Sequence, residues 1–354
     1  MEPTFVYVSC QPGAEKALKA EWEILSQGRA TFSFSRPGFV TFRMWEGWKP
    51  VALESVWART QGISYGKAQG NSQEGSFPDV IQRIKDWPTP VQVQLWYRDR
   101  WIPGDEPPKS DSDQWPEPFL DVMKLGDPTA KQILDVVVVD PGQVMWGIRL
   151  PRLRGDLGTP GEKWMGTLAE GAPSRAYLKL QEGLARNRFP MKPGEWVVEL
   201  GSSPGGACLA LLEKGVNVIG VDTAAMDPIL SQKFKGRFFH IPTTAQKTFP
   251  DQFPKDFRQI RILGGGLDWL FADMHIDAQD SLELVGQWVF EHQAALKGAV
   301  LTLKLKSWDQ AALVPRWVER FKSFGFSKIL ARQLSTNRQE IHLSGLTKKG
   351  ALLL

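Results

Sequence analysis

The chain has 354 residues, enough for two or three domains, and its 42% hydrophobic and 23% charged residues are ordinary for a globular protein. We recognise neither a signal peptide nor an apolar run long enough to span a membrane, so we expect a soluble, cytoplasmic protein with no membrane partner. The distant cysteines Cys10 and Cys208 exclude a disulfide framework, the four histidines lack metal-ligand spacing, and a net charge of +4 does not by itself indicate a nucleic acid partner.

The N-terminal region, residues 1–55, predicts a small α+β unit. Its apolar residues alternate where strands are expected and recur at helical spacing after Pro12. The break Arg36-Pro37-Gly38 between two alternating runs indicates a β-hairpin. The predicted elements are a strand at 5–10, a helix at 12–27, and hairpin strands at 30–35 and 39–44.

The next region, residues 56–150, predicts a second α+β unit. Its predicted elements are a helix at 77–87, a strand at 91–99, a polar loop at 103–118, and paired strands at 133–140 and 144–150. Neither this unit nor the first contains a glycine-rich phosphate turn. We therefore interpret both as binding or scaffolding modules.

Residues 151–354 predict a connector followed by an α/β domain. The connector runs to about residue 173, and between residues 149 and 192 nine basic residues outnumber four acids. Such a stretch fits either a phosphate backbone or a solvated linker with a basic helix. Strands then alternate with helices, which predicts a parallel, Rossmann-like sheet. The strands are expected at 195–201, 217–222, 267–274 and 299–305, with helices near 207–214, 281–296 and 312–325 and a last strand at 340–346.

A glycine-rich turn follows the first strand of this domain. It reads Gly201-Ser202-Ser203-Pro204-Gly205-Gly206, and Asp222 ends the next strand about 20 residues later. A turn at this place offers backbone N–H groups to a ligand, and the acid suits ribose hydroxyls, so an adenosine-containing cofactor is expected. The dinucleotide pattern GxGxxG is not matched, which favours S-adenosylmethionine (SAM). The alternative is a structural glycine turn in an enzyme with another ligand.

Charged residues end two other apolar strands of the domain. Asp273 ends one and Lys304 ends the other, where ligands bind in such folds. Lys179 and Glu340 would balance their charges if all four were close together. Ordinary surface charges at strand ends are the alternative.

Five motifs in order resemble a known enzyme class, the ribose 2′-O-methyltransferases of the heat-shock rRNA methyltransferase type, which use a Lys-Asp-Lys-Glu tetrad. The motifs are "PSRAYLKL", "ELGSSPGG", "FADM", "LTLKL" and "ARQLSTNRQEIHL". Within that class the chain resembles the bacterial large-subunit rRNA methyltransferase M family, which methylates a cytidine 2′-hydroxyl in 23S rRNA. The likeness covers nearly the whole chain, because "SCQPGAEKALKAE" also resembles the opening of that family.

The resemblance implies a role for each matching residue. Lys304 would accept the proton of the 2′-hydroxyl, and Lys179, Asp273 and Glu340 would complete the tetrad. The implied SAM-binding residues are Gly201, Ser203, Pro204, Gly205, Gly206, Asp222, Thr243 and Asp273, with no metal. The chain departs from the family at Ala207, where relatives have tryptophan, and around Thr243, where an acid near the adenine is replaced. Lys306, two residues beyond Lys304, competes for the role of base.

The resemblance also implies the domains and partners. Residues 1–55 would be a ferredoxin-like unit, residues 56–150 a THUMP-like RNA-binding domain, and residues 151–354 the methyltransferase domain with its connector. The partner would be large-subunit rRNA, free or in an assembly intermediate, rather than DNA, and the protein a monomer.

Two other functions remain open. One is methylation of a guanine nitrogen, although enzymes of that kind carry an Asn/Asp-Pro-Pro-aromatic motif where this chain has Ala272-Asp273-Met274-His275. The other is a non-catalytic RNA-binding factor for ribosome assembly.

Overall fold

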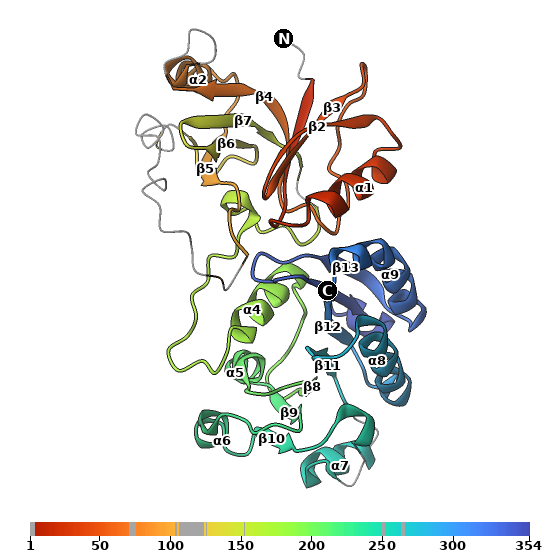
Figure 1. Ribbon diagram of the computed structural model, residues 1–354. Helices are drawn as coiled ribbons and strands as arrows, with labels where there is room; N and C mark the ends of the chain where they lie inside the picture. Colours follow the sequence, from red (N-terminus) through yellow and green to blue (C-terminus); the bar gives the residue numbers. More distant parts are fainter. Residues whose placement is uncertain are drawn as a thin grey trace. The chain divides into compact units, whose positions relative to one another are not determined.

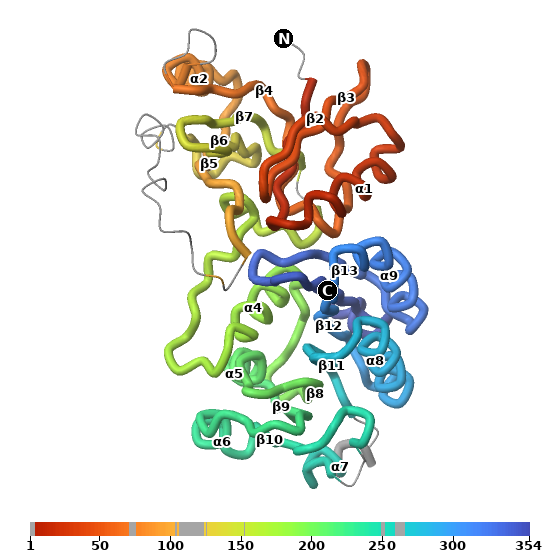
Figure 2. The backbone as a smooth tube through the Cα atoms, in the orientation of Figure 1, coloured from red at the N-terminus to blue at the C-terminus, as the bar shows by residue number. Residues whose placement is uncertain are grey.

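The computed structural model describes residues 4–70, 76–102, 105, 124, 126–151, 153–248, 252–262 and 266–354. The chain forms two compact units, Met1–Trp164 and Met165–Leu354 (Figure 1). Within the described residues each unit contains one seven-stranded sheet, and Figure 2 traces the backbone through both. Among the helices of those residues, none combines the length and apolar character needed to cross a membrane.

The N-terminal unit is an α+β structure built on a mainly antiparallel sheet. The strand order is β2-β3-β1-β4-β7-β6-β5, and β5 and β6 form a parallel pair. Ser76 caps α2 by accepting the Asp79 N–H, and Pro78 occupies an early position where its missing N–H costs nothing. The elements are β1 (Phe5–Ser9), α1 (Glu15–Leu25), β2 (Ala30–Arg36), β3 (Phe39–Met44), β4 (Gln61–Gln69), α2 (Phe77–Lys85), β5 (Gln92–Tyr97), β6 (Ile133–Asp140) and β7 (Gln143–Arg149).

Strand β4, which the sequence pattern did not reveal, joins the two halves of this sheet. It pairs with β1 on one side and with β7 on the other. The strand contains Gly62, Gly66 and three glutamine or lysine residues, so it lacks the apolar alternation that predicts a strand. The expected subdivision at residue 55 falls shortly before β4 and stays a prediction. Of the expected loop at 103–118, all but Asp105 lies outside the described residues.

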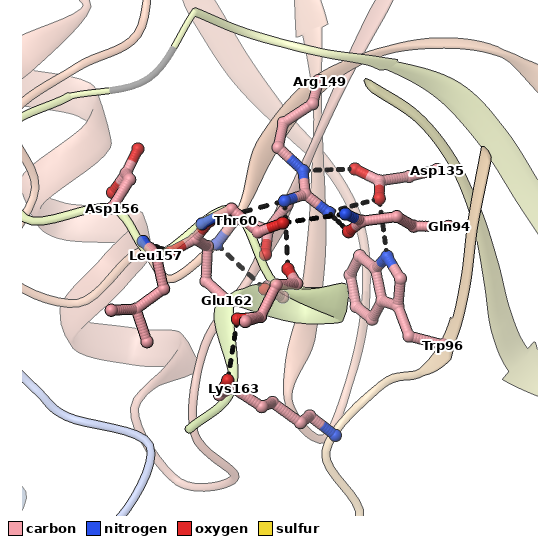
Figure 3. A network of polar contacts seen from close by, with 12 residues as sticks. Thr60, Gln94, Trp96, Asp135, Arg149, Asp156, Leu157, Glu162 and Lys163 are labelled. Atoms are coloured by element: carbon pink, nitrogen blue, oxygen red, sulfur yellow. Dashed lines mark hydrogen bonds and ion pairs between the residues drawn. The ribbon is translucent and has the colours of Figure 1, made fainter. Parts of the chain in front are cut away.

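A buried polar network fastens residues 157–162 to the N-terminal sheet (Figure 3). Asp135 is fully buried and accepts hydrogen bonds from Tyr7 Oη at 2.7 Å and Arg149 Nε at 2.8 Å. Arg149 Nη1 also donates to the Thr159 carbonyl at 3.1 Å, and Glu162 accepts the Gly158 N–H at 2.7 Å. A buried charge is tolerated only with such partners. The connector up to Trp164 therefore packs with the N-terminal unit, whereas we expected it to begin the C-terminal domain at residue 151.

The C-terminal unit is a Rossmann-like α/β domain. Its strand order is β10-β9-β8-β11-β12-β14-β13. The elements are α4 (Ala176–Asn187), β8 (Trp196–Leu200), α5 (Gly206–Glu213), β9 (Asn217–Val221), α6 (Pro228–Lys233), β10 (Phe238–Ile241), α7 (Lys255–Ile262), β11 (Trp269–Ala272), α8 (Ala278–His292), β12 (Gly298–Lys304), α9 (Val314–Ser323), β13 (Ser327–Arg332), β14 (Glu340–Leu346) and α10 (Lys348–Ala351).

The prediction of a parallel sheet is right for β8 to β12 and wrong for β14, which runs in the opposite direction; β13, which runs in the same direction as β12, was not predicted as a strand. Strands β10, β9, β8, β11 and β12 are paired in parallel. Strand β14 runs antiparallel to β12 and to β13. The short connection at residues 333–339 explains this, because a few residues can join antiparallel strands but not parallel neighbours.

The order of the parallel strands reverses at β8. The chain moves from β8 to β9 and β10 on one side and then returns to β11 and β12 on the other (Figure 1). Strands β8 and β11 are buried throughout, as expected for strands covered on both faces. The carboxyl ends of β8 and β11 therefore define the crevice in which α/β sheets bind ligands.

Candidate active site

The glycine-rich turn runs from the end of β8 into α5. Gly201 and Gly205 have φ values of +78° and +114°, which L side chains rarely adopt. A Cβ at Gly201 would lie 2.7 Å from the Asp273 carbonyl oxygen, and a Cβ at Gly206 would lie 2.3 Å from Ser174 Oγ. The turn thus passes directly against the end of β11 and the segment before α4, and only glycine fits at these points.

Asp222, at the end of β9, holds the turn from the other side. Its Oδ2 accepts the Ser203 N–H at 3.0 Å, and its Oδ1 accepts the Ala224 N–H at 2.9 Å. The side chain is half-buried, and each carboxylate oxygen can accept a further hydrogen bond. Asp222 can therefore shape the turn and bind a ribose hydroxyl at the same time. Thr243 lies just beyond β10, where its N–H donates to the Ile241 carbonyl at 2.8 Å.

The four charged residues expected to form a tetrad lie together at this edge of the sheet. Lys179 Nζ is 2.6 Å from Glu340 Oε2 and 3.5 Å from Asp273 Oδ2. Lys304 Nζ is 3.1 Å from Asp273 Oδ1, and Lys304 is paired in register with Glu340. The charges alternate in the order Glu340, Lys179, Asp273, Lys304. We call this group the tetrad.

The two lysines of the tetrad have different electrostatic surroundings. Lys179 contacts both carboxylates, whereas Lys304 contacts Asp273. Burial lowers the pKa of Lys179, but the neighbouring Asp273 and Glu340 outweigh burial and raise its pKa above the ordinary value. Lys179 is therefore a fixed cation, and Lys304 is the lysine with fewer acidic partners.

Lys306 lies outside the tetrad. Its side chain is 71% exposed and forms an ion pair with Asp277 at 2.9 Å, which raises its pKa. Lys304 is the last residue of β12 and is only 19% exposed. Both lysines are candidates for the base by sequence, but only Lys304 lies with the tetrad.

Glu199, the fourth residue of β8, belongs to this site and was missed by sequence reasoning. Its side chain is buried and accepts a hydrogen bond from Cys208 Sγ at 2.8 Å. Burial raises its pKa to about 8; the Cys208 bond opposes the shift, and the charges of Asp273 and Asp222 add to it. Glu199 also lines a small cavity of about 30 Å³ together with Lys179 and Asp273. The sequence feature that could have revealed Glu199 is an acid within the apolar strand "VVELG".

Comparison with known proteins identifies the domain that holds this site. Residues 172–336 match the FtsJ-like methyltransferase family. The C-terminal unit is an FtsJ-like methyltransferase domain. The protein named ribosomal RNA large subunit methyltransferase M from Halorhodospira halophila is 25% identical to the chain over 345 residues, which are 94% of each protein. Its namesake from Vibrio parahaemolyticus is 28% identical over 228 residues, 61% of this chain and 58% of the relative. The solved structure of TrmN from Thermus thermophilus superposes with a TM-score of 0.37 and 16% identity, covering 97% of this chain and 99% of that one.

The methyltransferase domain uses SAM, and the residues present fit this cofactor. The turn approaches its neighbours too closely to carry side chains at Gly201 and Gly206, so a ligand at these points would meet backbone groups rather than side chains. Asp222 keeps acceptor capacity after its two backbone bonds. Together these features suit the amino-acid and ribose parts of SAM.

Proposed function

We propose that this protein transfers the methyl group of SAM to the 2′-hydroxyl of a cytidine in large-subunit (23S) rRNA. The observation that carries the proposal is the alternating tetrad beside the glycine-rich turn, at the switch point of the methyltransferase domain. The relatives named ribosomal RNA large subunit methyltransferase M, one of them matched over 94% of its length, support rRNA as the substrate.

Each residue of the tetrad has a chemical role in this proposal. A ribose hydroxyl is a weak nucleophile near neutral pH, so its proton must be accepted as it attacks. Lys304 Nζ is the base. Of the two acids of the tetrad, Lys304 forms an ion pair with Asp273, whereas Lys179 forms ion pairs with both Asp273 and Glu340 and is held as a cation. Lys179 remains charged, and its ion pairs with Glu340 and Asp273 hold in place the carboxylate that contacts Lys304. Asp273 orients both lysines, and Glu340 fixes Lys179.

SAM, when bound, supplies the electrophilic methyl group. The turn residues Gly201, Ser203, Pro204, Gly205 and Gly206 would hold its amino-acid part through backbone groups, and Asp222 would bind the ribose hydroxyls. Asp273 would contact the cofactor next to the tetrad, and Thr243 would lie on the adenine side. Aligning hydroxyl and methyl group in this way supplies much of the rate enhancement in such reactions.

The N-terminal unit would capture the RNA. In this proposal its ferredoxin-like part (1–55) and THUMP-like part (56–150) bind large-subunit rRNA, free or in an assembly intermediate, and the protein acts as a cytoplasmic monomer. Arg149, Lys179 and Arg186 form ion pairs inside the protein, but the other six basic residues between 149 and 192 still outnumber the four acids, which supports a phosphate-rich partner.

Mapping ribose methylation on large-subunit rRNA tests the proposal. In a deletion strain one cytidine should lose its 2′-O-methyl group, and the wild-type gene should restore it while the Lys304→Ala gene should not. A methyl group on a base would instead indicate a base methyltransferase. RNA binding without any methyl transfer would indicate a non-catalytic assembly factor.

A further inference from the structure

A buried carboxylate connects helix α4 with the turn that precedes Glu340. Glu182 is 0% exposed, and it accepts hydrogen bonds from the N–H groups of Ser335 at 3.0 Å and Thr336 at 2.9 Å. The hydroxyl groups of the same two residues donate to it at 2.9 Å and 2.8 Å. Arg186 completes the arrangement, with Nη2 2.8 Å from Glu182 Oε1.

The charge of Glu182 is stabilised by these donors. Burial raises its pKa, but Arg186 and the donors of Ser335 and Thr336 outweigh burial, so the pKa is lowered below the ordinary value. Two consecutive backbone N–H groups and two hydroxyl groups aimed at one carboxylate require one conformation of the turn. An ionised Glu182 therefore fixes the backbone at residues 335–336 more tightly than a neutral acceptor would.

Helix geometry links this anchor to the tetrad. Lys179 and Glu182 are three residues apart on α4 and share one face of the helix. Glu340 follows Thr336 by four residues, at the first position of β14. Further along the same helix, Asn187 Nδ2 donates to His342 Nε2 at 2.9 Å, and Asn187 Oδ1 accepts from Ser344 Oγ at 2.6 Å. Helix α4 is thus bonded to the turn before Glu340 and to β14 beyond it.

We propose that Glu182 is a positioning residue for methyl transfer, an inference that rests on the proposed function. It anchors the turn at residues 335–336 to α4, and it thereby sets Glu340 at the 2.6 Å from Lys179 that holds the tetrad together. Glu182 contacts turn and helix residues rather than the reacting atoms, so its effect reaches the reaction through Lys179 and Glu340.

The variant Glu182→Gln tests the inference. A glutamine keeps the shape of the side chain but replaces one acceptor oxygen with an NH₂ group, which can only donate. In either orientation of the amide, this NH₂ group faces other donors, from the turn or from Arg186, and cannot accept their hydrogen bonds. We expect the single-turnover rate of methylation to fall about tenfold or more, with SAM affinity by calorimetry unchanged within about twofold. Hydrogen exchange of the peptide spanning 333–341 should be faster than in the wild type.

Glu195→Gln is the matched control. Glu195 is also a largely buried carboxylate of the same domain, and it accepts from Trp269 Nε1 at 2.6 Å and from the Lys192 N–H at 2.9 Å. It lies just before β8, at the amino end of the strands and away from the tetrad. This variant should lower the melting temperature but leave the methylation rate and the exchange of peptide 333–341 unchanged.

A milder variant keeps the inference testable if Glu182→Gln does not fold. Ser335→Ala combined with Thr336→Val removes both hydroxyl donors and keeps the backbone hydrogen bonds. This double variant should lower the single-turnover rate of methylation about threefold or more. An unchanged rate in a folded Glu182→Gln or in this double variant would overturn the inference and leave the proposed function standing. An equal loss of rate in Glu195→Gln would also overturn it. Failure of the wild type to methylate any rRNA would overturn the proposed function, and this inference with it.

Discussion

At the scale of single residues, side chains of the same type differ in their contacts and in their exposure to solvent. Lys179 lies in α4, Lys304 ends β12, and Lys306 follows two residues later, and the contacts of the three lysines differ. Lys179 is held by two carboxylates, Lys304 by Asp273, and Lys306 pairs with Asp277 at the surface. The chemical role of each lysine follows from these contacts and from its exposure.

Lys304→Ala should abolish most of the activity without harming the fold. The Lys304 side chain is 19% exposed but lies at the end of a strand beside the other tetrad residues rather than in the apolar core, so SAM binding and RNA binding should be nearly unchanged. Methyl transfer should fall about 100-fold or more, the usual effect of removing a positioned general base. Lys306→Ala is the control and should retain most activity in the same radiolabelled methyl-transfer assay. An active Lys304→Ala variant would rule out Lys304 as the base.

Glu199 should make the stability of the domain depend on pH. Its folded-state pKa of about 8 lies above the ordinary value of 4.5, so the folded state binds a proton that the unfolded state releases between these values. The stabilisation is complete below pH 4.5 and is lost as pH rises towards 8. Glu199→Gln cannot ionise, so at pH 8 its free energy of unfolding should exceed that of the wild type by roughly 1 kcal/mol or more.

Urea unfolding at pH 5 and pH 8 measures this effect. The advantage of Glu199→Gln should shrink at pH 5, where the wild-type carboxyl is protonated. An equal difference in stability at both pH values would show that Glu199 titrates normally.

At the scale of elements, the glycine-rich turn joins three parts of the methyltransferase domain. It lies against the end of β11, against the segment before α4, and against α6, where a Cβ at Gly205 would be 2.3 Å from Leu230 Cδ1. The N-terminus of α5 therefore has little freedom to move. This rigidity would preserve the proposed cofactor site, which is made mostly of backbone groups.

Gly205→Val should weaken SAM binding about tenfold or more. Its φ of +114° strains any residue with a Cβ, by roughly 1–2 kcal/mol, and the side chain would collide with buried Leu230. The turn must then shift away from the cofactor. Calorimetric titration with SAM measures the loss. Gly194→Ala is the control, because Gly194 also has a positive φ of +85° but has no atom within 4 Å of the added Cβ. If both variants bind SAM as the wild type does, the turn is not the cofactor site.

At the scale of the whole molecule, the boundary between the units decides how the protein can be divided. The contacts of Arg149 and Glu162 keep the connector up to Trp164 with the N-terminal unit, so a fragment beginning at residue 151 would remove part of a buried polar network. A fragment of residues 165–354 retains the complete sheet of the methyltransferase domain.

The 165–354 fragment should bind SAM like the full-length chain but bind rRNA about tenfold or more weakly. The reason is that the proposed RNA-capturing unit is missing, while the turn, Asp222 and the tetrad remain. Filter binding at several salt concentrations provides the measurement, and the affinity of the full-length protein should fall steeply with salt because phosphate contacts release counterions. Equal rRNA affinity of fragment and full-length protein would remove the RNA-binding role of the N-terminal unit.

The sequence by itself determined the α/β class, the glycine-rich turn and the strand-end positions of Asp222, Asp273 and Lys304. These features are local: a run of apolar residues, a glycine cluster and the charge that follows a strand can all be read within a few residues. It also predicted most strands and several helices, but it missed β4, β10 and β13 and the reversed direction of β14, because strand pairing depends on distant partners.

Only the tertiary structure decided which charges meet. The hydrogen bond between Lys179 and Glu340 joins residues 161 positions apart, and no periodicity in the sequence encodes such a contact. The same holds for Glu182, which accepts four hydrogen bonds from a turn more than 150 residues away, and for the raised pKa of Glu199, which depends on burial. A residue type is a property of the sequence, but its partner and its exposure to water arise from packing, and these determine its chemistry.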